Sequence, residues 1–230
     1  MKSIFPMLVI ATLVLATLAC SININVPTIK TGETEILRVN EAVPSGSDFS
    51  KLALKMGAGE LYLTSGAEGL VQGKIYYNVA AWKPTIIRDQ NSVRIEQGQL
   101  EKVKLPSDDV TNSWELKLGA SPIDLTIDAG AYKGTLNLGG LSLVNLTIRD
   151  GASQSEVIFD SPNLVEMEQL QYKTGASEVK LMNLANANTR SVSFDSGAGS
   201  YTLDFSGTLS RDMQVDIKSG VSSIKIIVPE

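Results

Sequence analysis

Apolar and polar residues alternate in short runs through the second half of the chain, and each run leads to a glycine. The residues five and three positions before each of these glycines are apolar, and the residue between them is polar. An apolar residue at every second position is the pattern of a β-strand with one buried face. The glycines recur at spacings of 21, 24, 22 and 23 residues, and they are Gly130, Gly151, Gly175, Gly197 and Gly220.

One such unit is too short to bury its own apolar side chains, whereas stacked units can share a continuous core. In a stack, Leu125 of one unit would lie beside Leu146 of the next and Leu170 of the one after. The pattern therefore predicts an all-β fold, a right-handed single-stranded β-helix (solenoid) of roughly 21–24-residue coils. The hand follows from the preferred chirality of parallel crossovers. Short strands at this spacing also suit an antiparallel sandwich or meander, but five units in one register favour the solenoid.

The same register can be followed into the first half of the chain. Leu52 and Leu54 precede Gly57 at the expected positions, and Trp114 and Leu116 stand in the same relation to Gly119. We therefore expect Trp114 to point into the core. No sustained apolar stripe with helical spacing follows residue 26, which argues against a helical fold.

The beginning of the chain has the features of an export signal. After Lys2 the chain is mainly apolar from residue 4 to residue 19, and Cys20, the only cysteine, follows directly. This run is shorter than the about 20 residues of a membrane-spanning helix, and it ends in small residues, as a secretory signal peptide does. The segment before Cys20 is similar to the lipobox of bacterial lipoproteins, with Thr17 where leucine is usual. That resemblance implies cleavage before Cys20 and a lipid on its thiol; an ordinary signal peptide or an uncleaved anchor is the alternative.

Several motifs in the first half point to a known family. They are Met56-Gly-Ala-Gly-Glu-Leu-Tyr-Leu63, Leu70-Val-Gln-Gly-Lys74, Tyr77-Asn78 and Trp82-Lys83-Pro84. In these motifs the chain resembles the toast-rack N-terminal domain of bacterial envelope proteins, which include relatives of the cell-wall-active antibiotic response proteins. The later coils resemble the putative adhesin-type domains that accompany it. The resemblance covers about residues 48–228 and implies a right-handed single-stranded β-helix.

These patterns together divide the chain into three segments. Residues 1–19 are expected to be a signal peptide, and residues 20–48 a lipidated N-terminal tether that includes one edge strand at Glu35–Val39. Residues 49–230 are expected to form a single β-solenoid domain, toast-rack-like over 49–130 and with adhesin-like coils over 131–230.

Composition and charge exclude several classes of function. The chain has no histidine, which excludes histidine-dependent catalytic triads and histidine-ligated zinc. With Cys20 carrying lipid, the mature chain would have no disulfide and no thiolate metal ligand. Without residues 1–19 it would have 19 basic and 25 acidic residues and a formal charge of −6, which disfavours nucleic acid as a partner. We expect no metal and no cofactor.

Two pairs of residues are candidates for function. Glu166 and Glu168 would share one face of a strand, and paired carboxylates are the chemistry of glycosidases; a solvated outer face is the alternative. Tyr77 and Trp82 could bind a partner by stacking on sugars or docking a protein, although large aromatics also serve to close the open end of a solenoid.

The sequence predicts a non-enzymatic, lipid-anchored protein of a bacterial cell envelope, exposed outside the cytoplasm. Its partners would be the membrane, through the lipid on Cys20, and an envelope protein or a cell-wall glycan. Its role would be adhesin-like or part of an envelope stress response. Two alternatives stay open, a polysaccharide-active enzyme that uses Glu166 and Glu168, and a passive structural spacer.

Overall fold

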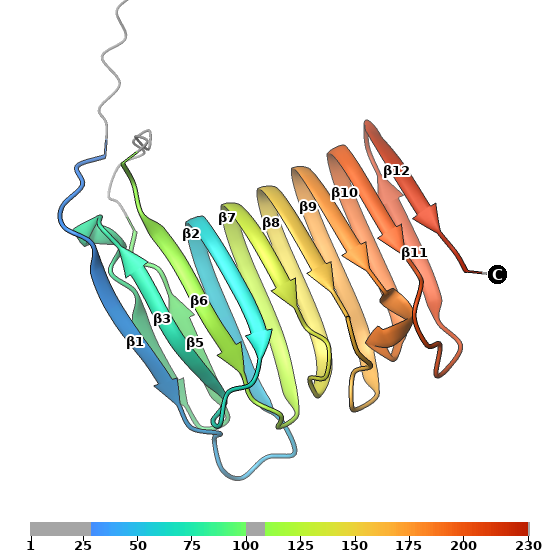
Figure 1. Ribbon diagram of the computed structural model, residues 1–230, viewed down its shortest axis with the longest axis horizontal. Coiled ribbons are helices and arrows are strands. Elements are labelled where there is room, and N and C mark those ends of the chain that lie inside the picture. The colour runs from blue at the N-terminus through green and yellow to red at the C-terminus, as the bar shows by residue number, and fades with distance from the viewer. Residues whose placement is uncertain (1–28, 100–108, 230) are drawn as a thin grey trace, which may run out of the picture.

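The computed structural model describes residues 29–99 and 109–229, and over these residues the chain is all-β apart from two short 3-10 turns (Figure 1). The 3-10 turns are η2 (Ala80–Trp82) and η3 (Leu184–Ala187). The expected signal peptide and Cys20 lie outside the described residues. The strands are β1 (Glu35–Glu41), β2 (Ser50–Ser65), β3 (Val71–Tyr77), β4 (Thr85–Asp89), β5 (Ser92–Glu96), β6 (Asn112–Leu118), β7 (Ile123–Asn137), β8 (Leu143–Ile158), β9 (Met167–Met182), β10 (Thr189–Asp204), β11 (Gln214–Ser219) and β12 (Ser222–Ile227).

The five long strands, β2 and β7 to β10, each contribute to two faces of one stack. The pairing of β10 shows the change of face, because Ser191–Ser196 pairs with β11 whereas Gly199–Asp204 pairs with β12. The first half of β2 likewise pairs with β5 and its second half with β6. In Figure 1 the bent strands lie side by side, with β11 and β12 at one end. The inner side chains of both halves form one continuous hydrophobic core.

The parallel register predicted for the second half is confirmed. Leu125, Leu146, Leu170 and Val192 are partners in successive strands, and Val192 is partnered in turn with Val215. The first four of these side chains are at most 1% exposed. Strands β7 to β12 pair only in parallel, so the antiparallel sandwich is wrong for this half of the chain.

The first half departs from a simple succession of coils. β2 lies between β6 and β7 in the sheet, so the chain adds β3 to β6 on one side of β2 and then continues as β7 on the other. β3 is antiparallel to both β1 and β6, and β4 is antiparallel to β5. The strand expected at Glu35–Val39 is present as β1, and its pairing with β3 places the start of the sheet inside the segment expected to be a tether.

The register assigned around Gly119 is wrong, although the burial expected for Trp114 is confirmed. Trp114 pairs with Leu61 and Leu116 with Leu63, which places both in the half of the coil that follows the bend rather than in the half before it. Trp114 is fully buried. Gly119 lies instead at the other edge of the stack, where its N–H donates to the carbonyl of Leu70. By contrast, Leu52 pairs with Leu125, as the register around Gly57 predicts.

The repeated glycines are required by space rather than by backbone torsion. None of the five has a φ in the left-handed region. A Cβ built on Gly175 would lie 2.4 Å from the carbonyl oxygen of Gly151, and one on Gly197 would lie 2.4 Å from the carbonyl oxygen of Gly175. Successive backbones therefore approach one another so closely at the bend that a methyl group does not fit between them.

Asparagines bind the opposite edge of the stack. The side chain of Asn163 donates to the carbonyl of Leu143 at 2.8 Å and accepts from the N–H of the same residue at 2.8 Å. Asn188 has a φ of 52°, a left-handed conformation that asparagine tolerates better than most residues, and its amide donates to the carbonyl of Val165. Side-chain amides thus add to the backbone hydrogen bonds where the chain turns between strands.

We expect Gly175→Ala to lower the free energy of unfolding by about 1–3 kcal/mol, the usual cost of forcing atoms into a packed site. The Cβ would meet backbone, which cannot move aside as a flexible side chain can. The control is Gly57→Ala at the first position of the same glycine column, where a Cβ would contact only the side chain of Gln97, at 3.5 Å. Chemical denaturation of both variants checks this, and equal stabilities would contradict the close approach.

Candidate interaction surfaces

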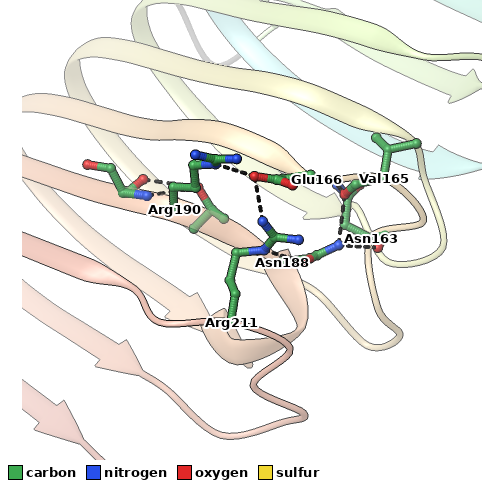
Figure 2. Close-up of polar contacts among 8 residues, drawn as sticks. Asn163, Val165, Glu166, Asn188, Arg190 and Arg211 are labelled. Atoms are coloured by element: carbon green, nitrogen blue, oxygen red, sulfur yellow. Dashed lines mark hydrogen bonds and ion pairs between the residues drawn. The ribbon is translucent and has the colours of Figure 1, made fainter.

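The carboxylate of Glu166 is held by two arginines. Glu166 directly precedes β9. Its carboxylate pairs with Arg190 on β10 and with Arg211 in the segment before β11, and Arg211 Nη1 lies 2.5 Å from Glu166 Oε1. Figure 2 shows both guanidinium groups directed at this carboxylate. Arg211 Nε also donates to Asn188 Oδ1 at 2.8 Å. The cluster ties three consecutive parts of the stack together along the edge that the asparagines line.

This pairing disfavours the catalytic role considered for Glu166 and Glu168. Hydrogen bonds from Arg190 and then Arg211 hold the pKa of Glu166 below its ordinary value. A general acid in glycoside hydrolysis needs a raised pKa, so that it carries a proton at neutral pH. Glu168 is exposed on β9. The geometry around Glu166 is that of a structural ion-pair cluster that links neighbouring coils.

Tyr77 and Trp82 lie inside the fold. Tyr77 is 3% exposed, and its hydroxyl donates to Glu35 Oε2 at 2.7 Å. Burial, together with this hydrogen bond, raises the pKa of Tyr77 to about 12. Trp82 is 7% exposed and packs against Ile29 and Val79. Both aromatics thus fasten the first described residues to the sheet, which agrees with the packing alternative, and they offer no exposed stacking platform.

A role for Trp82 in partner binding stays a prediction. The structural feature relevant to it is a recess at the surface next to Trp82. Trp82 is one of the residues that line this recess, which has a volume of about 450 Å³. The recess has a mixed lining from β2, β6 and the corner of β7, including Ala58, Glu60, Asn112 and Ala131.

A buried hydroxyl cluster was not found by sequence reasoning. The hydroxyl of Tyr172 donates to Asp150 Oδ2 at 2.7 Å and lies 2.6 Å from Ser155 Oγ. Burial raises the pKa of Tyr172 and that of its neighbour Tyr132, the latter to about 12. These phenols therefore stay protonated at neutral pH, and the cluster serves as a satisfied polar part of the core rather than as a nucleophile. In the sequence, Asp150 stands directly before the repeated Gly151, and this position alone does not indicate a hydrogen bond to a buried tyrosine.

The part of each coil that precedes the bend carries a flat polar face on its outer side. Thr126, Thr147, Gln171, Ser193 and Asp216 are register partners on consecutive strands β7 to β11. Paired strands lie about 4.8 Å apart, so these hydroxyl, amide and carboxylate groups form an evenly spaced row. We call this row and the outward residues on either side of it on the same strands the polar face.

A recess lies at the end of the stack formed by β11 and β12. Its volume is about 670 Å³, and its lining is mainly apolar, including Phe205, Leu209, Met213, Ile226 and Val228. The sequence pattern assigned the apolar residues of β11 and β12 to the core. Among the described residues, however, β11 and β12 pair with β10 alone, so nothing covers their outer edge.

The described residues show neither a metal-binding cluster nor a membrane-spanning helix. Over 29–99 and 109–229, no three His, Cys, Asp or Glu side chains gather as ligands for a metal ion. In the same ranges no helix has the length and apolar character needed to cross a membrane.

The fold has counterparts among solved structures. A putative cell adhesion protein from Clostridium sporogenes matches with a TM-score of 0.64 at 20% identity, over 84% of this chain and 98% of that chain. A putative adhesin from Bacteroides fragilis matches over 87% of this chain and 100% of that chain, at 13% identity and a TM-score of 0.32. The first likeness concerns the fold alone. No curated protein matches the sequence.

A family model matches nearly all of the described chain. It matches residues 30–168 and, in a second match, residues 162–227. The matched residues include β1 to β12, and they therefore cover both the antiparallel strands of the first half and the parallel coils of the second. With this coverage, the chain belongs to the family described as the N-terminal domain of toast_rack, DUF2154.

Proposed function

We propose that this protein is a non-enzymatic interaction module of a bacterial cell envelope, adhesin-like or part of an envelope stress response. The observation that carries the proposal is the polar face, a flat row of hydrogen-bonding side chains held in register by a continuous core. Because its backbone is already ordered, a surface of this kind loses little conformational entropy when it binds an extended partner. The resemblance in fold to a putative cell adhesion protein from Clostridium sporogenes is consistent with this.

The anchoring of the module belongs to the same proposal. Residues 1–19 would be removed as a signal peptide, Cys20 would carry the lipid, and the residues that follow would connect the lipid to β1. The successive coils would wind as a right-handed single-stranded β-helix, because parallel crossovers prefer that hand. The partner at the polar face would be an envelope protein or a cell-wall glycan.

Lipidation can be tested directly in a bacterial host. We expect the wild-type chain to incorporate an alkyne-labelled fatty acid, and Cys20→Ser to abolish both the label and cleavage after residue 19. Ser21→Ala, one position later, is the matched control and should be labelled normally. Label that survives in Cys20→Ser would refute this anchoring, because the chain has no other cysteine.

Photo-crosslinking in intact cells tests the binding face. A photoreactive residue replaces Lys173, which is exposed beside the row on β9, and separately Tyr62, which is 37% exposed on the second half of β2. We expect a discrete crosslinked protein, or glycan, from the Lys173 position and not from the Tyr62 position. Equal products from both would contradict the polar face as the binding surface, and no product from either would favour a passive spacer.

The enzyme alternative predicts a different electrostatic state of Glu166. We expect NMR titration of its carboxyl carbon to give a pKa below the ordinary value of 4.5, because Arg190 and Arg211 stabilise the charged form. Arg190→Ala and Arg211→Ala should each raise it. Since the folded pKa is lowered, the ion pairs stabilise the fold above the ordinary pKa and lose this effect as the pH falls through the folded value.

A raised pKa for Glu166 would instead support a general acid. Turnover of cell-wall polysaccharide that is lost in Glu168→Gln, with the fold intact, would replace the interaction module by an enzyme.

A further inference from the structure

The two ends of the stack are closed to different degrees. At the first end, β1 and β4 are the outermost strands of the two faces, as Figure 1 shows for β1. A bidentate ion pair joins them, with Arg88 Nε and Nη2 donating to the carboxylate of Glu41 at 2.6 and 2.7 Å. The apolar side chains Val39 and Ile95 nearby are 3% and 0% exposed. The core at this end is covered, although β1 and β4 each pair on one side only among the described residues. A planar two-bond contact holds these edge strands in place.

The opposite end leaves core-type positions open. Val215 occupies the register position of Val192, and Ile226 occupies that of Leu203. Val192 and Leu203 are fully buried, whereas Val215 is 40% and Ile226 is 51% exposed. Val228 is 70% exposed on the same recess of about 670 Å³. The same side-chain positions thus change from core to surface because no further strand covers them among the described residues.

The backbone at this end is also unpaired on its outer side. β11 and β12 both hydrogen-bond to β10, and within the described chain neither has a second neighbour. An edge strand with free N–H and C=O groups and exposed apolar side chains is a template for another strand. β11 is the last strand of one face and β12 is the last strand of the other. A partner that extends both faces must therefore offer two strand edges separated by the distance between β11 and β12.

We propose that this end binds the same end of a second copy of the chain, in a two-fold dimer that continues both faces. A second copy presents the two edges at the matching spacing and brings an equivalent set of apolar side chains. The first end of another copy is a poor partner, because Arg88 and Glu41 join its edge strands and its core is already covered. A two-fold contact closes on itself and yields a dimer rather than a fibre.

The charges on β11 fit this symmetry. A two-fold axis perpendicular to the two faces makes β11 run antiparallel to β11 of the second copy. If the axis passes Ile217, Asp216 lies opposite Lys218 of the second copy, and Lys218 lies opposite its Asp216. Both side chains are exposed, at 54% and 71%, and within one chain Lys218 Nζ lies 3.4 Å from Asp216 Oδ2. Opposite charges in directly facing positions stabilise an antiparallel pair and like charges destabilise it, so the strand is complementary to itself.

Sedimentation equilibrium of the full-length chain in density-matched detergent tests the dimer. We expect a two-fold mass for the wild type and a dissociation constant raised by about tenfold or more in Ile226→Lys, which places a charge in the apolar contact. The matched control is Ile36→Lys, because Ile36 is 52% exposed on β1 at the other end. This variant should dimerise as the wild type does.

A charge exchange on β11 distinguishes the contact from a general loss of structure. Asp216→Lys alone and Lys218→Asp alone should each weaken the dimer, and the double variant D216K/K218D should restore it, since opposite charges face each other again. Thermal melting of each variant at a fixed low concentration verifies the fold.

Three results would overturn the proposal. They are a wild-type mass of one chain throughout the concentration range, an open series of larger assemblies, and a dimer that survives both Ile226→Lys and the single charge changes. A monomer in which another segment of this chain or a different protein covers the recess gives the first of these results. Asp216 and Lys218 belong to the polar face, but Ile226 does not, and the mass measurement needs no envelope partner. Failure of the dimer is therefore distinguishable from failure of the proposed function.

Discussion

The close approach of successive backbones at the bend is the constraint on which the stack depends. A Cβ on Gly130, Gly151, Gly175 or Gly197 would lie within 3 Å of the carbonyl oxygen of the preceding glycine in the column. With glycine there, the strands can pair in register on both sides of the bend without spreading apart at the corner. The alanines that follow the glycines lie in register as well, and Ala131 pairs with Ala152 as Ala176 pairs with Ala198.

This constraint explains why the second half could be predicted well. When every coil has one glycine at the same corner, the side chains at fixed distances from it must lie in columns. Leu125, Leu146 and Leu170 are therefore placed by counting along the chain. The length of the loop at the opposite edge varies from coil to coil, so the spacing between glycines changes by up to three residues while the columns persist.

The first half could not be predicted in the same way, because its pairing is not local. The run around Trp114 has the same alternation as a strand before a bend, yet it pairs with the second half of β2, some fifty residues earlier. Alternation identifies which side chains are buried, and Trp114 is. It does not say which neighbour a strand has, and antiparallel strands such as β3 show the same alternation as parallel ones. The inserted strands separate Gly57 from Gly130, so counting fails there.

The roles of single side chains in the candidate sites could not be predicted from the sequence either. Tyr77 and Glu166 have ordinary sequence surroundings, and their roles depend on residues from other coils. Glu35 lies on the neighbouring strand β1, and Arg190 and Arg211 belong to the next two turns of the chain. A carboxylate that looks available for catalysis in the sequence is held in an ion pair once the coils stack. An aromatic that looks available for binding is needed to pack the first described residues.

The same stacking logic makes the ends of the molecule its least determined parts. Inside the stack, each strand is paired on both sides and each inner side chain is covered by its column neighbours. At an end, the strand pairing and the side-chain cover are both missing on one side, and other contacts must stabilise the exposed edge. Reversed strands and the Arg88–Glu41 pair supply it at the first end. At the end formed by β11 and β12 the inner column continues unchanged to Val215 and Ile226. An end built like an interior coil is suited to contact with another such coil.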